Sequence, residues 1–349
     1  MPGSGRAEFD EAGGVALWIA GLLTPVLVRS LRARRIGQHI REDGPTSHSA
    51  KAGTPTMGGI VIVLAAVTGF LLGHLGTHVP FTRAGALVCF AIVAYGFIGF
   101  LDDIIKVRNK RSLGLNKRAK MILQLAFGLI FAELALHWAH TATTVSFTRF
   151  DLPGWHLGEV GWVAMAIVVI VGTSNAVNLT DGLDGLAAGS STFCFAVLAI
   201  VGYWQFRHFP IYNVSSALDL ALSSIALAGA CLGFLWWNAA PARIYMGDTG
   251  SLSIGAGMAA LCLMMNLDLL LVIIGGLFVI ETLSVITQVI SFRLFHRRVF
   301  KMAPIHHHFE LLGWPETTVI VRFWILAGLF AALGLGIFYA DFLQVAKVV

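Results

Sequence analysis

Apolar residues gather in ten long runs along the chain, and glycine, proline and charged residues separate these runs. Each run approaches the roughly 20 residues that a helix needs to cross a bilayer. Only Asn266 and Asp268 separate the eighth run from the ninth, so we expect a tight turn there. The pattern predicts an all-α polytopic membrane protein with about ten transmembrane helices in a single domain over 1–349. The runs cover residues 13–29, 57–76, 84–101, 121–138, 160–177, 186–204, 217–237, 251–267, 269–292 and 322–343.

Composition supports the same fold class. Hydrophobic residues make up 57% of the chain and charged residues only 12%, whereas about a quarter of the residues of a soluble domain are charged. The first run lacks a small-residue cleavage site, so we interpret it as a membrane span and not as a cleaved signal. The segment 139–159, between two runs, is predicted to form a small hairpin.

The distribution of basic residues predicts the topology. Of the 24 lysines and arginines, 19 fall in the loops that follow the odd-numbered runs. Because cytoplasmic loops are enriched in these residues, we place the odd loops in the cytoplasm and both termini in the periplasm.

Acidic residues on the predicted cytoplasmic face suggest a site there. Five aspartates stand at the mouths of apolar helices, where unpaired like charges are costly unless cations compensate them. Carboxylate, amide and hydroxyl oxygens suit Mg²⁺ or Mn²⁺ bound together with a phosphate. Nearby lysines and arginines suit the phosphate oxygens. The five aspartates are Asp102, Asp103, Asp181, Asp184 and Asp248.

Each acidic motif also has a purely structural interpretation. Asn178, Asp181 and Asp184 are spaced by three and share one face of a helical turn, but they are also typical of a capped helix start. The Asp102 and Asp103 pair is compatible with solvent-exposed salt bridges at the end of a helix. Asp248, between two glycines, is compatible with a tight loop. The placement of all three motifs at one membrane surface favours a functional site.

Three consecutive histidines, at 306–308, lie in the last predicted cytoplasmic loop. Adjacent residues rarely converge on one tetrahedral zinc ion, so we interpret the histidines as donors or cations beside phosphates. The chain has no GxxxxGK, GxGxxG or GxSxG motif, which argues against an ATP-driven pump, a dinucleotide enzyme and a serine hydrolase.

Five motifs together resemble the phospho-N-acetylmuramoyl-pentapeptide-transferase family, within the polyprenyl-phosphate N-acetylhexosamine-1-phosphate transferase superfamily. The resemblance extends in order from about residue 20 to 343, and the first and last motifs point to the pentapeptide branch. The motifs are Lys-Ala-Gly-Thr-Pro-Thr-Met-Gly-Gly at 51–59, Phe-Leu-Asp-Asp-Ile-Ile-Lys at 100–106, Asn-Leu-Thr-Asp-Gly-Leu-Asp-Gly at 178–185, Met-Gly-Asp-Thr-Gly-Ser at 246–251 and Pro-Ile-His-His-His-Phe-Glu at 304–310.

The resemblance implies a bacterial cytoplasmic-membrane enzyme that transfers phospho-MurNAc-pentapeptide from UDP-MurNAc-pentapeptide to undecaprenyl phosphate. The products would be lipid I and UMP, Mg²⁺ would be required, and no nucleic-acid partner is expected. Asp248 would bind Mg²⁺, and Asp102 or Asp103 would deprotonate or orient the lipid phosphate. The implied substrate-binding set is Lys51, Thr56, Asn178, Asp181, Asp184, Gly185, Asn238, Ser251, Gln288 and His307, and His306 would contact the diphosphate or sugar as part of the catalytic set.

Several points stay open at this level. Lys106, Lys110, Arg118 and Lys120 all lie in the predicted phosphate loop, and we take Lys120 as the catalytic candidate. Direct attack by the lipid phosphate and a two-step route through an aspartyl intermediate are both compatible with the residues. The oligomeric state, including a homodimer, is also undecided, because small-residue stretches pack helices within one chain or between two.

Two alternative functions follow from the same residues. A relative that transfers GlcNAc-1-phosphate would share the aspartate motifs but not the histidine motif or residues 51–59. A cation or proton transporter would use intramembrane acids such as Glu133 and Glu281.

Overall fold

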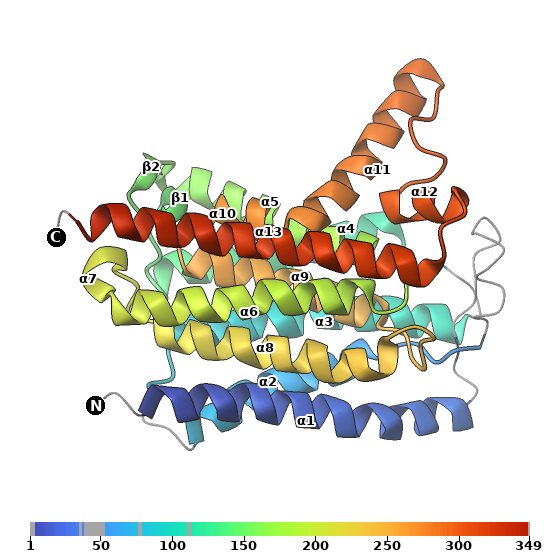
Figure 1. Cartoon of the computed structure of the whole chain (residues 1–349), viewed down its shortest axis with the longest axis horizontal. Coiled ribbons are helices and arrows are strands. Elements are labelled where there is room, and N and C mark those ends of the chain that lie inside the picture. The colour runs from blue at the N-terminus through green and yellow to red at the C-terminus, as the bar shows by residue number, and fades with distance from the viewer. Residues whose placement is uncertain (1–3, 35–36, 38–52, 76–78, 110–112, 348–349) are drawn as a thin grey trace.

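The computed structural model describes residues 4–34, 37, 53–75, 79–109 and 113–347, with side chains from residue 11 onward. Within these ranges the protein is mostly helical, as predicted, and contains one two-stranded hairpin (Figure 1). The elements are α1 (Ser4–Ala33), α2 (Gly59–Leu75), α3 (Arg83–Arg108), α4 (Lys117–His137), β1 (Thr144–Arg149), β2 (Leu152–His156), α5 (Gly158–Thr180), α6 (Leu186–Arg207), α7 (Phe209–Tyr212), α8 (Ala217–Asn238), α9 (Gly247–Met264), α10 (Leu270–Ile274), α11 (Gly276–Phe295), α12 (Ile305–Leu311) and α13 (Glu316–Val345).

Eight helices in the described part of the chain are long and apolar enough to cross a membrane: α1, α3, α4, α5, α6, α8, α11 and α13. The protein is therefore a multi-pass membrane protein. Helix α2 is apolar but has only 17 residues. Each of the ten predicted runs lies on helical structure, but the prediction of ten crossings stays a prediction.

Helix α9 occupies the centre of the bundle. Every residue from Thr249 to Met264 is buried, and α9 packs mainly on α3 and α5. Small residues make this position possible: a methyl group on Gly255 would lie 2.5 Å from the Thr173 carbonyl oxygen of α5. A helix that is apolar and buried on all sides is typical of the core of a large bundle.

The ninth apolar run, predicted as one membrane span, forms two helices and not one. The run divides at Gly275 into the short α10 and the longer α11, which leans away from the bundle (Figure 1). Two consecutive glycines remove the side chains that stiffen a helix, and sharp changes of direction are common at such sites. Gly276 also fits directly against the Phe330 ring of α13, where a methyl group would lie 2.5 Å from Cγ.

The hairpin predicted within 139–159 is confirmed as the antiparallel pair β1 and β2. It lies at the same end of the bundle as α7, the start of α1 and the end of α13, whereas α12 lies at the opposite end (Figure 1). Placement of the two ends of the chain on one side agrees with an even number of crossings. The assignment of that side to the periplasm stays a prediction.

Candidate active site at the mouths of α3 and α9

Three carboxylates from two helices meet in the interior of the protein. Asp102 and Asp103 belong to the last two turns of α3, and Asp248 belongs to the first turn of α9. One ligand oxygen from each lies within 4.8 Å of the others, and the side chains of Asp102 and Asp103 are buried. This set of hard oxygen donors could hold a divalent metal ion.

The two adjacent aspartates of α3 have different environments. The backbone N–H groups of Asp248 and Thr249 donate to Asp103 at 3.1 and 3.0 Å, and Thr249 Oγ1 donates at 2.7 Å. Asp103 therefore satisfies the otherwise unpaired N–H groups at the start of α9, where a negative charge is also favourable. Among the described residues, Asp102 accepts one backbone bond, from Leu115 at 2.9 Å.

Glycines allow the approach of α9 to α3. Gly247 has φ +72°, which favours glycine, and a methyl group there would lie 2.6 Å from Asp103 Oδ2. On the facing helix, a methyl group on Gly99 would overlap the carbonyl oxygen of Asp248. Larger residues at either position would move the carboxylates apart.

Two lysines neutralise most of this negative charge. Lys106 Nζ lies 2.7 Å from Asp102 Oδ2, 2.9 Å from Asp248 Oδ1 and 3.8 Å from Asp103 Oδ1. Lys120, at the start of α4, forms an ion pair with Asp248. Lys106 was one of four open possibilities and not the chosen candidate, although its spacing of four and three residues from the two aspartates already indicated contact.

Helix α5 adds amide and carboxyl groups to the cluster. Asn178 Nδ2 donates to Asp248 Oδ1 at 3.2 Å and to Ser251 Oγ at 2.8 Å. Asp181 directly follows this helix, and removal of its carboxyl from water, followed by the charge of Asp248, raises its pKa well above the usual range. The structure thus brings Asn178, Asp181 and Ser251 close to the aspartates, and their predicted contact with the substrate stays a prediction.

The three histidines at 306–308 have separate partners. His306 Nδ1 lies 3.0 Å from Glu281 Oε1, and His307 Nδ1 lies 2.6 Å from Glu310 Oε2. His308 Nδ1 accepts the Lys301 N–H at 3.1 Å. Each histidine thus has its own partner, and the interpretation of the histidines as donors or cations beside phosphates stays a prediction.

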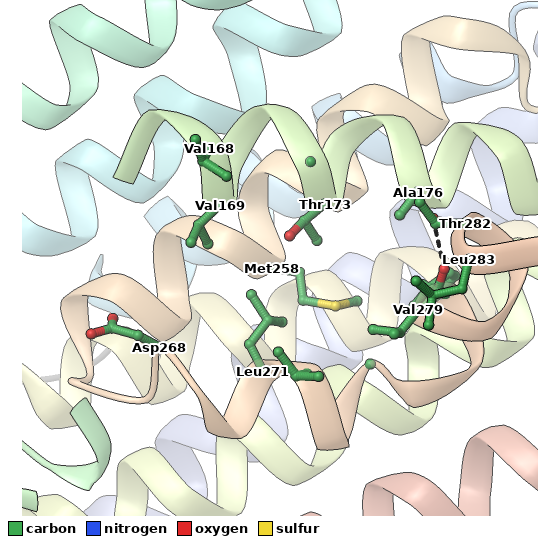
Figure 2. Close-up of a pocket in the computed structure, with 14 residues that line it drawn as sticks. Val168, Val169, Thr173, Ala176, Met258, Asp268, Leu271, Val279, Thr282 and Leu283 are labelled. Atoms are coloured by element: carbon green, nitrogen blue, oxygen red, sulfur yellow. Dashed lines mark hydrogen bonds between the residues drawn. The ribbon is translucent and has the colours of Figure 1, made fainter. Parts of the chain in front are cut away.

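An apolar groove of about 250 Å³ lies beside the site, between α5, α9, α10 and α11 (Figure 2). Most of its lining is aliphatic, including Val168, Val169 and Leu283, and Asp268 stands at one end. Along α5 the groove extends to Ala176, five residues before Asp181.

The comparison with known proteins decides the family. Residues 85–266, half of the chain, match the model described as Glycosyl transferase family 4, and residues 51–63 match Phospho-N-acetylmuramoyl-pentapeptide-transferase signature 1. A phospho-N-acetylmuramoyl-pentapeptide-transferase of Frankia casuarinae is 50% identical over 95% of this chain and 97% of its own length. The chain belongs to the phospho-N-acetylmuramoyl-pentapeptide-transferase family. Relatives with the same name from Saccharopolyspora erythraea and Streptomyces griseus are 49% and 46% identical, over 95% and 94% of this chain and 97% of each relative.

Backbone hydrogen bonds connect residues 51–63, which match the signature of this transferase family, to the segment that precedes Asp248. The N–H groups of Gly58 and Gly59 donate to the carbonyl oxygens of Tyr245 and Met246, each at 2.8 Å, directly before the Asp248 motif. Thr56, half-buried, lies beside this connection. Lys51 lies outside the described residues, so its predicted contact with the nucleotide stays a prediction.

Three other predicted substrate-binding residues of this transferase stabilise loops in the structure. Asp184 Oδ2 accepts the Ala242 N–H at 2.9 Å, and Asn238 Nδ2 donates to the Ile244 carbonyl at 2.9 Å. Gln288 bonds the backbone of Val299 and Phe300 through both ends of its amide.

Gly185 combines a conformational role with close packing. It starts α6 with φ +77°, and a methyl group there would lie 2.9 Å from Leu235 Cδ1. Substrate contact by Asp184, Gly185, Asn238 and Gln288 stays a prediction, and the contacts that the structure shows hold loops and the start of α6 in place.

The acids that suggested a transporter have local partners. Glu133 lies on the exposed face of α4, 3.3 Å from His137 one turn later. Glu281 pairs with His306, as noted. Neither residue belongs to a chain of titratable groups across the described part of the bundle.

Proposed function

We propose that this chain transfers phospho-MurNAc-pentapeptide from UDP-MurNAc-pentapeptide to undecaprenyl phosphate, forming lipid I and UMP at the cytoplasmic face of the bacterial cytoplasmic membrane. The observation that carries the proposal is the partly buried cluster of three aspartates and two lysines beside an apolar groove. One substrate is a water-soluble polyanion and the other is a lipid. A charged site where helices end next to an apolar groove suits both.

The donor set of the cluster fits Mg²⁺. Asp248 would hold the ion with the help of Asp102, since Asp103 already accepts three hydrogen bonds from the start of α9. When bound, Mg²⁺ would neutralise phosphate charge, which is most of what phosphoryl transfer needs. Replacement of Asp248 by Asn keeps the side-chain shape but removes the anionic ligand, so we expect Asp248→Asn to lose Mg²⁺-dependent turnover.

The two lysines and the two aspartates of α3 have different proposed roles. Lys106 and Lys120 supply positive charge toward the diphosphate and the lipid phosphate. Of the two aspartates first considered for the lipid phosphate, Asp102 has fewer bonds to the protein backbone, so we assign to it the deprotonation or orientation of that phosphate. Asp103 instead holds α9 in position. Direct attack and a covalent aspartyl route both remain compatible with this arrangement.

The pocket for the nucleotide would form around the turn after α5. Asn178 and Asp181 face the aspartate cluster, and His306 and His307 approach the same turn from α12. The apolar groove along α5 would take part of the isoprenoid chain, because its aliphatic lining matches hydrocarbon and its volume suits only a segment of such a chain.

The membrane arrangement is part of the same proposal. We infer ten crossings in a single domain, with both termini in the periplasm and the active site in the cytoplasm. The bias of basic residues supports this orientation, and a cysteine placed at Ser47 should resist an impermeant thiol reagent in intact cells.

The decisive experiment is incubation of the purified protein with radiolabelled UDP-MurNAc-pentapeptide, undecaprenyl phosphate and Mg²⁺, with Asp248→Asn as the matched control. We expect labelled lipid from the wild type and none from the variant. A wild type that labels lipid only from UDP-GlcNAc would favour the GlcNAc-1-phosphate alternative. A wild type inactive with both donors would refute the proposal.

A further inference from the structure

A buried acid and imidazole pair lies between α11 and α12. The side chains of Glu281 and His306 are both fully buried, and Glu281 Oε1 lies 3.0 Å from His306 Nδ1. The second nitrogen of the ring, Nε2, has no hydrogen-bond partner among the described residues, and neither has Glu281 Oε2. A buried polar atom without a partner is costly, so the free Nε2 needs an explanation.

The unpartnered nitrogen faces the proposed nucleotide pocket. A methyl group on Gly182 would overlap His306 Nε2, so the glycine makes room for this atom directly after Asp181. His307 Nε2 would lie 3.3 Å from the same methyl position, and the two imidazole rings are 4.2 Å apart. Two imidazoles from α12 therefore converge on the turn that follows α5.

Glu281 determines which hydrogen-bonding role His306 can have. A buried pair favours states of zero net charge. In one such state the carboxylate pairs with a doubly protonated ring, and in the other a neutral carboxyl donates to Nδ1. In both, Nε2 carries a proton, because a neutral imidazole that accepts at one nitrogen donates at the other. In either state of the pair with zero net charge, Nε2 is a donor whose direction is fixed by the ring.

We propose that Glu281 is a positioning residue that holds His306 with its Nε2–H directed at an acceptor oxygen of the sugar nucleotide. The inference rests on the proposed function, because it names the role of a residue in that reaction. Glu281 itself does not touch the substrate. Its effect passes through the ring that it orients, as the partners of ligand histidines generally do.

The first test is Glu281→Gln, which keeps the size of the side chain but cannot form the charged pair. We expect kcat/KM for UDP-MurNAc-pentapeptide to fall about ten- to a hundredfold, as for loss of one charge-assisted hydrogen bond. KM for undecaprenyl phosphate should not change. The matched control is Glu133→Gln, which breaks another glutamate and histidine pair, on the exposed face of α4, and should leave both substrates unaffected.

A double-mutant cycle separates positioning from a structural role. If Glu281 acts only through His306, then Glu281→Gln should have no further effect in a His306→Ala background. Calorimetric titration with the UDP substrate gives the same cycle without turnover, and the melting temperature in detergent tests folding of each variant.

Additive effects of the two changes, an equal rise of both KM values, or wild-type kinetics in Glu281→Gln would overturn the inference while leaving the transferase activity of the wild type intact. Absence of labelled lipid from the wild type would instead overturn the proposed function, and the inference with it.

Discussion

Replacement of Asp103 by alanine tests whether this residue holds α9 in position. The carboxylate accepts two backbone N–H groups and one hydroxyl from residues 248 and 249. Loss of these bonds would leave the start of α9 without its partner on α3. Because Asp248 is the first of these donors, the change should also displace the proposed metal ligand.

The expected loss of stability follows from the number of bonds. Each hydrogen bond to a charged group contributes about 1.5 kcal/mol, so three contribute about 4.5 kcal/mol. Removal of a buried charge returns part of its desolvation cost, and we therefore expect the free energy of unfolding to fall by about 3 kcal/mol. Thr249→Val removes only the hydroxyl bond at 2.7 Å and should cost about 1 kcal/mol.

The assay is unfolding by sodium dodecyl sulfate in mixed micelles, followed by tryptophan fluorescence, beside the transfer assay. Asp102→Ala is the matched comparison, because that carboxylate accepts a single backbone bond from the part of the chain that the structure describes. We expect Asp102→Ala to lose turnover with a smaller change in stability. If Asp103→Ala unfolded within about 0.5 kcal/mol of the wild type, as surface variants do, its proposed role in α9 would be refuted.

Three further predictions concern charge. Lys106→Met should lower kcat about a hundredfold, as for loss of a donor to developing charge. Arg118→Met, at an exposed position of α4, should leave kcat unchanged. Equal losses of kcat in the two variants would contradict the role of Lys106. Asp184→Ala should weaken calorimetric binding of the UDP substrate and also loosen the loop at Ala242, and unchanged affinity would limit it to a structural role. Burial raises the pKa of Asp268 to about 7. The contribution of its neutral form to the stability of the fold is therefore fully present below about pH 4 and is lost as pH rises through 7. We expect the melting temperature of Asp268→Asn to lie above that of the wild type at pH 8 and close to it at pH 4.

The positions of the helices could be predicted because membrane spans are encoded locally. A run of about 20 apolar residues is sufficient to predict a span, and every predicted run lies on helical structure. The break at Gly275 was not predicted, because hydropathy continues through it. Gly276 packs against Phe330 where α11 begins, and such a contact between distant segments leaves no periodic signal.

The residue types of the candidate site could be predicted from the sequence, but the different environments of the individual residues could not. Aspartates at helix mouths are conspicuous in an apolar chain, and the pattern predicted five of them on one face of the membrane, of which the structure brings three together. It could not separate Asp102 from Asp103, because the difference lies in bonds to α9, more than 140 residues away. Of the loop cations only Lys120 was chosen as the catalytic candidate, whereas the structure brings both Lys106 and Lys120 to Asp248.

Close helix packing and charge placement depend on each other in this protein. The bonds from α9 to Asp103 are 2.7 to 3.1 Å long, and a hydrogen bond weakens steeply beyond this range. Gly99 and Gly247 allow this approach, since a methyl group at either would meet Asp248 or Asp103. An aspartate so deeply buried is tolerable only while its partners stay in place. A larger residue at either glycine would therefore impair the charged site without removing any charge, and these two glycines belong to the site as much as the aspartates do.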